Sequence, residues 1–141
     1  MSLQYKNLVG WQRADDLFVE VHRITHQCFP PEERYELGRQ LRRAALSVPS
    51  NIVEGNTRHH TRDKLNFFNI ASGSLSEVTY GLHAAHRLGY IDDVTYQRLD
   101  EHARMVTAPL YGLIRKKRAE LIVKSVMSVT TILMFASVVL F

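Results

Sequence analysis

The sequence predicts an all-α protein, folded as an antiparallel up-down-up-down four-helix bundle. Apolar residues recur at alternating spacings of three and four along most of the chain, and no stretch alternates with period two for long. The 141 residues suit one compact domain, and 45% hydrophobic with 23% charged residues is typical of a folded protein. Short connections between four such helices favour antiparallel neighbours and therefore a closed bundle.

The first helix is expected at residues 7–27. Its apolar stripe consists of Trp11, Ala14, Leu17, Phe18, Val21 and Ile24. The segment 29–33, Phe-Pro-Pro-Glu-Glu, comes next. Prolines are tolerated in the first turn of a helix, and carboxylates there face the positive end of the helix dipole. This segment is therefore expected to end the first helix and start the second.

The second helix is expected at residues 32–57. Its apolar stripe consists of Leu37, Leu41, Ala44, Val48 and Ile52. Pro49 lies inside the stripe and has no amide donor, so it should kink or split the helix. Asn51, Glu54 and Gly55 are polar or small residues in an apolar helix. We expect them to contact polar residues of the third helix across the bundle, rather than to form an active site.

The third helix is expected at residues 61–88, with Thr61 as its cap and Gly89 just beyond its end. Its apolar stripe is the most regular of the four: Phe68, Ala71, Leu75, Val78, Leu82 and Ala85. Small residues fill the middle of this helix around Gly73. A glycine inside a helix costs about 1 kcal/mol, so this stretch is expected to allow a neighbouring helix to approach closely.

The fourth helix is expected at residues 92–123, with Asp92 as its cap. Its apolar stripe consists of Leu99, Ala103, Val106, Leu110 and Leu113. Pro109 should kink it as Pro49 does the second helix. Helices of about 25 residues are about 38 Å long at 1.5 Å per residue, which is long and thin for a monomer of this size. We therefore expect the bundle to self-associate through leftover apolar surface.

Residues 125–141 differ from the bundle at 1–124. These seventeen residues carry no charge, twelve of them are apolar, and a basic run at 115–118 precedes them. A membrane-spanning helix needs about 20 apolar residues, with 17 near the lower limit. Three interpretations stay open: a membrane anchor that leaves the bundle in the cytoplasm, an extension that stabilises an oligomer, or a tail that is not native.

The basic residues are concentrated in two blocks. The chain has a net charge of +4, but residues 34–64 hold seven basic and three acidic residues, and residues 115–124 hold five and one. Such clustering suits a polyanion, although a solvated helix face would also produce it. Arginine binds phosphate oxygens through two parallel hydrogen bonds, so the first block is the better candidate for a nucleic-acid backbone. The candidate binding residues are Arg39, Arg42, Arg43, Arg58, Arg62 and Lys64.

Catalytic and metal-binding motifs are not found in the sequence. It has no glycine-rich phosphate loop, no nucleophile elbow and no zinc-protease motif, so no catalytic residue and no cofactor are predicted. His22 and His26 are one helical turn apart, as are His83 and His86, but neither pair has a third ligand in register. No metal site is predicted. One cysteine, Cys28, and no apolar leader favour a cytoplasmic protein.

Several motifs together resemble one family. The segment 41–55, LRRAALSVPSNIVEG, is similar to the signature of the four-helix-bundle proteins encoded in intervening sequences of 23S ribosomal RNA genes. The segments 29–35 and 70–77, the start of the first helix and the Leu-Gly-Tyr turn at 88–90 fit the same family. The resemblance covers about residues 8–118. Pro109 and the apolar tail depart from the family pattern.

The resemblance implies a homopentamer of four-helix bundles with an electropositive surface and no established enzyme activity. Carried over to this chain, Arg42, Arg43 and Arg58 are expected on that surface. A related branch, the accessory proteins of diversity-generating retroelements, is thought to hold a reverse transcriptase and RNA. The first hypothesis is therefore a non-enzymatic, oligomeric protein that binds nucleic acid, RNA rather than DNA. The alternative is a scaffold that binds a protein partner such as a reverse transcriptase.

Overall fold

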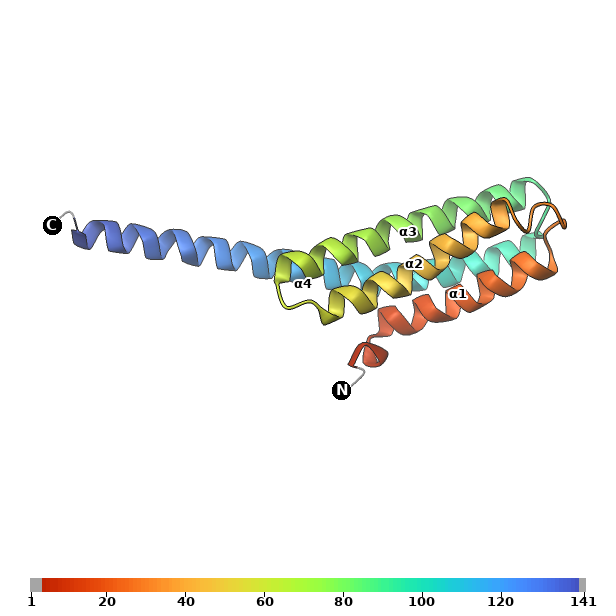
Figure 1. The fold of residues 1–141 in the computed structure, drawn as a ribbon. Coiled ribbons are helices and arrows are strands. Elements are labelled where there is room, and N and C mark those ends of the chain that lie inside the picture. Colours follow the sequence, from red (N-terminus) through yellow and green to blue (C-terminus); the bar gives the residue numbers. More distant parts are fainter. Residues whose placement is uncertain (1–3, 140–141) are drawn as a thin grey trace.

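The computed structural model describes residues 4–139 and shows a four-helix bundle with one helix much longer than the others (Figure 1). Within these residues there is no strand. Each helix packs against its neighbour in the chain, and the first also packs against the fourth, which closes the ring. The elements are a short 3₁₀ helix, Gln4–Asn7, followed by α1 (Val9–Gln27), α2 (Leu37–Thr57), α3 (Thr61–Arg87) and α4 (Asp93–Val139).

The core consists of the apolar stripes expected from the sequence, with small shifts in register. All six stripe residues of α3 are buried, and so are four of the five in α2. In α1 the buried side is centred on Leu17 and Val21, whereas Trp11 and Phe18 are only half-buried against its edge. In α4 the buried positions continue from Leu110 to Ile114 rather than to Leu113. The predicted fold class is therefore confirmed.

The start of α2 lies later than predicted. The helix begins at Leu37 instead of residue 32, because the preceding residues form turns. The side chain of Phe29 is buried in the core, and Arg34 Nε donates a hydrogen bond of 3.1 Å to its carbonyl oxygen. The Gly38 amide donates to the Glu33 carbonyl oxygen at 2.8 Å, and this bond closes the turn. Burial of Phe29 thus sets the path of the connection.

Neither internal proline divides its helix. Pro49 lies inside α2 and Pro109 inside α4, and both helices continue through them, so the expected split is wrong. Ser50 Oγ donates to the Leu46 carbonyl oxygen at 2.8 Å, one residue beyond Ala45, whose carbonyl oxygen has no amide partner at Pro49. Pro109 faces α1, where a Cβ atom on Gly10 would lie 3.5 Å from its side chain.

The close approach of α2 and α3 occurs at glycines other than Gly73. A Cβ atom at Gly73 would meet nothing within 4 Å, so its expected role in helix packing is wrong. A Cβ atom at Gly81 would lie 2.5 Å from Leu41 Cδ1, and one at Gly55 would lie 2.7 Å from Phe68 Cε1. Both contacts join α2 and α3, so these two glycines allow the helices to pack closely.

A polar contact also links α2 and α3. Ser47 Oγ and Ser74 Oγ lie 2.7 Å apart, and Asn51 Nδ2 donates to the backbone carbonyl and the hydroxyl oxygen of Ser47. The expected contact of Asn51 with α3 is therefore wrong: its side chain bonds to Ser47 of its own helix, and Ser47 makes the polar contact with Ser74. Ser74 is buried, so this pairing satisfies a hydroxyl group that would otherwise destabilise the core.

The predicted cap at the start of α3 is wrong, whereas the predicted end of the helix at Gly89 is confirmed. Thr61 does not cap α3: it is the first residue of the helix, it is buried, and its hydroxyl oxygen accepts a hydrogen bond from Lys124 Nζ at 3.0 Å. At the other end Gly89 has a φ of 77°, and the amides of Gly89 and Tyr90 donate back to His86 and Ala85. This arrangement is a Schellman motif, which needs a residue with left-handed backbone.

The fourth helix begins as predicted and ends later. Asp92 Oδ1 accepts a hydrogen bond of 2.8 Å from the Thr95 amide, as expected for a cap. Hydrogen bonding by the Thr95 side chain, and then by its amide, lowers the pKa of the Asp92 carboxyl group. The helix does not end near residue 123 but runs to Val139 and projects beyond the bundle (Figure 1). Residues 122–139 are exposed throughout.

Candidate nucleic-acid interface

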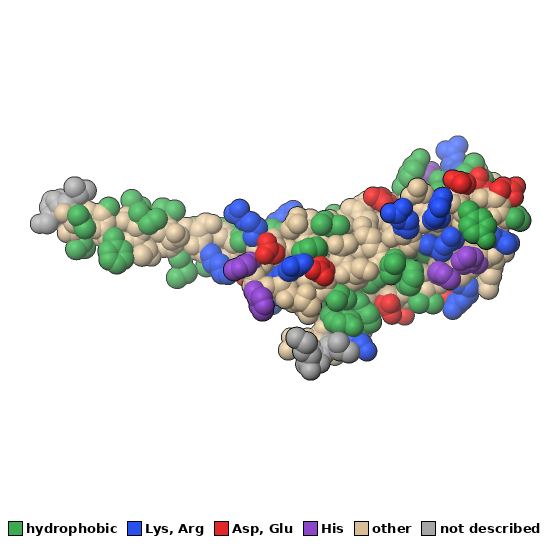
Figure 2. Space-filling model, in the orientation of Figure 1, with side chains coloured by type: hydrophobic (Ala, Val, Ile, Leu, Met, Phe, Trp, Pro, Cys, Tyr) green, Lys and Arg blue, Asp and Glu red, His purple; other side chains and the backbone are tan. Residues whose placement is uncertain are grey.

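The six basic residues predicted to bind nucleic acid do not form one patch. Arg39, Arg42 and Arg43 lie in the first turns of α2, whereas Arg58 and the others lie around its end. The two groups are about 28 Å apart along the helix axis, at 1.5 Å per residue. Figure 2 shows basic side chains gathered in two places, near the connection of α1 and α2 and near the point where α4 leaves the bundle.

Arg42 is directed toward the protein rather than toward solvent. Its Nη1 atom donates to Thr25 Oγ1 at 3.0 Å, and its Nη2 atom donates to the Arg34 carbonyl oxygen at 2.8 Å. Thr25 is fully buried. These hydrogen bonds tie α2 to the end of α1 and to the connection between them, so Arg42 stabilises the fold and uses two of its five N–H donors within the protein.

Arg39 and Arg43 are exposed and lie four residues apart, which places them on the same side of α2. Neither guanidinium group forms an ion pair or a hydrogen bond with any residue of the described range 4–139. Beside Arg43 is a surface groove between α2 and α3, which we name the α2–α3 groove. It is made of two adjoining hollows that share Gln40, Ala44 and Glu77: Arg43, Ser47 and Ser74 complete the first, and Leu37, Leu41, Tyr80 and Gly81 complete the second.

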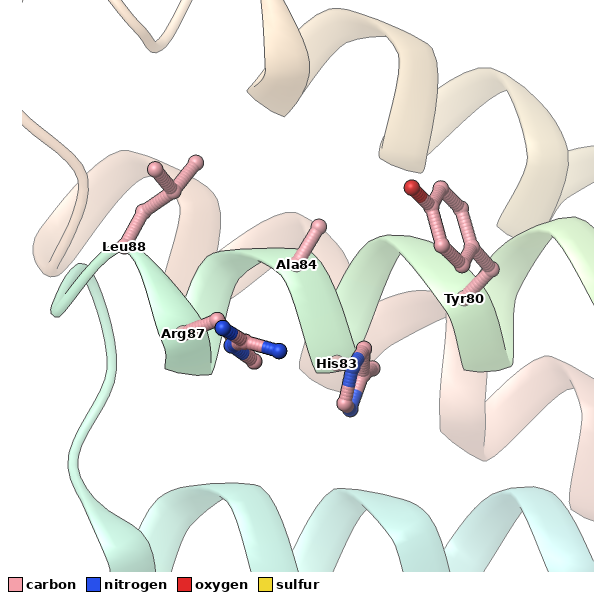
Figure 3. Close-up of a pocket in the computed structure, with 5 residues that line it drawn as sticks. All are labelled: Tyr80, His83, Ala84, Arg87 and Leu88. Carbon is pink, nitrogen blue, oxygen red and sulfur yellow. The ribbon is translucent and has the colours of Figure 1, made fainter.

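Tyr80 is a candidate binding residue that the sequence analysis missed. Its side chain is 72% exposed, because a position two residues from the buried Val78 and Leu82 lies on nearly the opposite side of the helix. It lines both the α2–α3 groove and the adjoining hollow shown in Figure 3, whose labelled residues come from α3 and, for Leu88, from just beyond its end. An aromatic residue outside the apolar stripe is the sequence signal that could have identified it.

Glu77 and Arg87 set the charge around this tyrosine. Arg87 lines the hollow in Figure 3 together with His83, one turn away on the same side of α3. Glu77 lines both parts of the groove and opposes the binding of an anion there. The groove therefore combines the exposed guanidinium group of Arg43 and an aromatic ring with one unfavourable carboxylate.

The second group of basic residues is partly engaged within the protein. Arg58 pairs with Glu54 and lies over the Phe67 ring, with its guanidinium carbon 4.7 Å from the ring centroid. Lys64 Nζ donates to the Asn56 carbonyl oxygen at 3.1 Å. Arg62 is exposed and forms no ion pair with the described residues.

The contact between Lys124 and Thr61 joins the two basic blocks of the sequence in space. It places the block at 115–124 alongside the start of α3, next to the second group of basic residues. The linear sequence does not show this neighbourhood, since Lys124 and Thr61 are 63 residues apart.

The histidine pairs lie close to the basic residues without forming a cluster of metal ligands. The rings of His22 and His26 are 4.7 Å apart between centroids. Partial desolvation, followed by the positive charge of Arg42, lowers the pKa of His26 below its ordinary value, so His26 is neutral near pH 7. Across residues 4–139, no three His, Cys, Asp or Glu side chains are grouped so that they could hold a metal ion.

Comparisons with known proteins agree with the resemblance in sequence. One solved structure with a similar fold is the crystal structure of a protein of unknown function from the S23 ribosomal protein family of Bacteroides thetaiotaomicron. It is 21% identical, covers 75% of this chain and 98% of its own length, and superposes with a TM-score of 0.70, so the likeness concerns the fold. No curated protein matches the chain. The family model described as 23S rRNA-intervening sequence protein matches residues 6–112, and the chain therefore belongs to that family.

Proposed function

We propose that this protein is a non-enzymatic, oligomeric RNA-binding protein that acts in the cytoplasm. The observation that carries the proposal is the α2–α3 groove, where the exposed Arg43 lines one part and the exposed Tyr80 lines the adjoining part. Arg39 and Arg43 have donors that no described residue occupies, so phosphate oxygens are suitable acceptors for them. A pair of arginines on one side of a helix follows a sugar–phosphate backbone without reading its bases.

Tyr80 favours RNA with unpaired bases over duplex DNA. A base stacked on an exposed aromatic ring contributes about 1–3 kcal/mol and does so for any sequence. Paired bases in a duplex do not offer their faces for stacking, whereas single-stranded RNA does. The proposed mode is therefore backbone contact by Arg39 and Arg43 and stacking on Tyr80, with no sequence specificity.

The basic residues at the end of α2 and the start of α3 would make secondary contacts with RNA. Arg58, Arg62 and Lys64 are about 28 Å from Arg39 along the axis of α2, so only a longer strand can reach both groups. Arg42 contributes positive charge to the region but no direct contact, since its donors bind Thr25 and the Arg34 carbonyl oxygen. Assembly of several copies would bring further groove surfaces together and raise the apparent affinity.

The proposal is tested by removing the two exposed charges. In R39Q/R43Q, the affinity for a labelled single-stranded RNA of mixed sequence should fall on the order of 10-fold or more at low salt. The slope of log K against log salt should become shallower by about 1 to 2. R104Q is the matched control, because Arg104 is an exposed arginine on α4 that pairs with Asp100. Fluorescence anisotropy over a salt series measures both quantities.

Glu77 provides a test in the opposite direction. E77Q removes the carboxylate from the groove, so it should tighten RNA binding by about 3-fold to 10-fold at low salt, with the gain vanishing at high salt. Equal affinities of R39Q/R43Q, E77Q and the unmodified protein would contradict the proposed site.

A scaffold that binds a protein partner, such as a reverse transcriptase, is the second candidate function. The observation that favours it is the exposure of Tyr35 and Tyr80, at 66% and 72%, because tyrosines are enriched in protein interfaces. If Y80A abolished binding of a protein partner while R39Q/R43Q bound RNA as tightly as the unmodified protein, the scaffold function would replace the RNA-binding proposal.

A further inference from the structure

The part of α4 beyond the bundle has no partner in the structure. The last buried residue of α4 is Ile114, and the helix continues to Val139 (Figure 1). An 18-residue window of this helix has a mean hydropathy of 1.9 and is not buried at all. Water is a poor environment for such a surface, since exposed apolar patches of this extent mark interaction sites.

Large apolar side chains occur on all sides of residues 125–139, which we name the projecting helix. Val126, Val129 and Leu133 lie along one side, at spacings of three and four. Met134 and Phe135, which are 71% and 68% exposed, lie on other sides. A coiled coil of two copies would cover the first side and leave the others in water. A helix that is hydrophobic all round is typical of a membrane span.

Four of the five hydroxyl groups of the projecting helix, all but that of Ser128, donate hydrogen bonds to backbone carbonyl oxygens of α4. Ser125 Oγ donates to Leu121, Thr131 Oγ1 to Met127 and Ser137 Oγ to Met134, at 2.9, 2.8 and 2.7 Å. Thr130 Oγ1 also donates to backbone carbonyls in the preceding turn. Polar groups in hydrocarbon must find partners within the protein, and these side chains do so without a second chain.

Positive charge is concentrated where the projecting helix begins. Arg115, Lys116 and Arg118 are exposed, and Lys124 is the last charged residue before the uncharged stretch 125–141. Lys117 pairs with Glu120 at 2.8 Å. Basic residues at the end of an apolar helix attract anionic lipid headgroups, and they keep their side of the chain in the cytoplasm.

We propose that the projecting helix inserts into an anionic lipid bilayer, with Arg115, Lys116, Arg118 and Lys124 at the headgroup phosphates. The uncharged part of the described helix, residues 125–139, is about 22 Å long, against a hydrocarbon thickness of about 30 Å, so Lys124 reaches toward the interface from the helix end. The bundle then lies on the cytoplasmic surface. This inference does not depend on RNA binding, because it uses residues outside the α2–α3 groove.

Vesicle flotation tests the insertion. The full chain, purified in mild detergent and treated with nuclease, should float with vesicles of phosphatidylcholine and phosphatidylserine in equal parts. L133D places a carboxylate in the middle of the span and should lower the vesicle-bound to free ratio on the order of 100-fold. L46D is the matched control, since Leu46 is an exposed leucine of the bundle, and it should float as the unmodified protein does.

Two further variants separate insertion from adsorption to the surface. In F135W, the tryptophan emission should shift to the blue on vesicles and be quenched by brominated acyl chains. R115Q/K116Q/R118Q should bind the mixed vesicles about five-fold more weakly for each charge removed, and should bind phosphatidylcholine vesicles as the unmodified protein does.

The proposal is overturned if the unmodified protein stays in solution with both kinds of vesicle, or if L133D floats as well as L46D. It is also overturned if the protein forms an oligomer in detergent-free buffer that L133D dissociates, while no flotation occurs. In that case a second copy of the chain covers the projecting helix.

Discussion

Arg42 and Arg43 of α2 have different roles, because the side chain of Arg42 points toward the protein and that of Arg43 points toward solvent. Arg42 and Arg43 are adjacent in sequence and identical in chemistry, yet one binds the buried Thr25 and the other lies at a surface groove. A turn of 100° per residue separates them on the helix. The basic segment of α2 therefore contains one arginine that stabilises the fold and one that is available to a ligand. Both carry the same charge, so charge alone does not distinguish these roles.

Replacing Arg42 should destabilise the protein much more than replacing Arg43. R42M removes two hydrogen bonds from a charged donor, so we expect a loss of about 2 kcal/mol in the free energy of unfolding. R43M should change this free energy by less than about 0.5 kcal/mol, as is usual for an exposed residue. Urea unfolding of both variants measures the difference. Equal midpoints would mean that the contacts of Arg42 do not stabilise the fold.

Glu20 should contribute to stability only while it is ionised. It accepts hydrogen bonds from Arg98 of α4 and, at 2.6 Å, from Arg23, and the bond from Arg98 is the main cause that lowers its pKa. Because the pKa is lower in the folded state, this stability is present above the ordinary pKa of 4.5 and is lost as the pH falls below it.

The variant E20Q should therefore be less stable than the unmodified protein at pH 7 and equally stable near pH 3. Both arginine partners are about half-exposed, so solvent screening limits the expected difference at pH 7 to about 0.5 kcal/mol. Urea midpoints at the two pH values measure it, with E101Q as the exposed control. A deficit that persisted in acid would indicate a packing effect rather than lost ionic contacts.

At the scale of elements, the pairing of α2 with α3 depends on which glycines face a neighbour. Gly55 and Gly81 each face a large side chain across the interface, whereas Gly73 faces solvent. All three lie inside helices, where glycine lowers stability by about 1 kcal/mol relative to alanine. Replacing glycine with alanine should consequently stabilise the protein where the glycine faces solvent and destabilise it where the glycine faces a large side chain.

G73A should stabilise the protein by about 0.5 to 1 kcal/mol, because a methyl group there meets nothing and alanine favours the helix. G55A should destabilise it by about 1 to 3 kcal/mol, since the new methyl group would lie 2.7 Å from the Phe68 ring and 3.2 Å from the Lys64 carbonyl oxygen. Thermal unfolding of the two variants side by side is the measurement. A stabilising G55A would show that Phe68 can move aside.

At the scale of the whole molecule, the bundle and the projecting helix differ in character. The family match covers residues 6–112 and the buried part of α4 ends at Ile114, so both leave out the projecting helix. The start of α2, which contributes Gln40 and Arg43 to the α2–α3 groove, lies at one end of the bundle, and the apolar helix leaves from the other (Figure 1). The proposed RNA contacts in the groove and the proposed membrane contacts therefore lie at opposite ends of the molecule, whereas Arg58, Arg62 and Lys64 lie at the membrane end.

The proposed assembly should be visible in the native mass. We expect five copies, as the family resemblance implies, with additional mass that ribonuclease removes when the protein is isolated from cells without nuclease. Native mass spectrometry of the unmodified protein and of L133D, both from mild detergent, measures it. Five copies in both would place the oligomer contacts in the bundle. A monomer free of nucleic acid would contradict the assembly and the bound RNA together.

Local patterns were sufficient for the fold class and for much of its detail. The stripe of α3, the Asp92 cap and the stop at Gly89 depend on residues close in sequence, so helical periodicity and backbone preference predicted them correctly. The late start of α2 could not be predicted in this way, because burial of Phe29 in a core built from all four helices outweighs the preference of the local segment.

The composition of the candidate site depended far more on tertiary structure than the fold class did. The sequence identified basic residues, but helix orientation turned Arg42 inward, and packing of α2 on α3 brought Tyr80 beside Arg43. In the same way, only the folded chain places Lys124 against Thr61 and leaves the whole projecting helix in solvent. Periodicity is a local property, whereas the neighbours of a side chain depend on residues far away in sequence, and these neighbours establish which charges a ligand can reach.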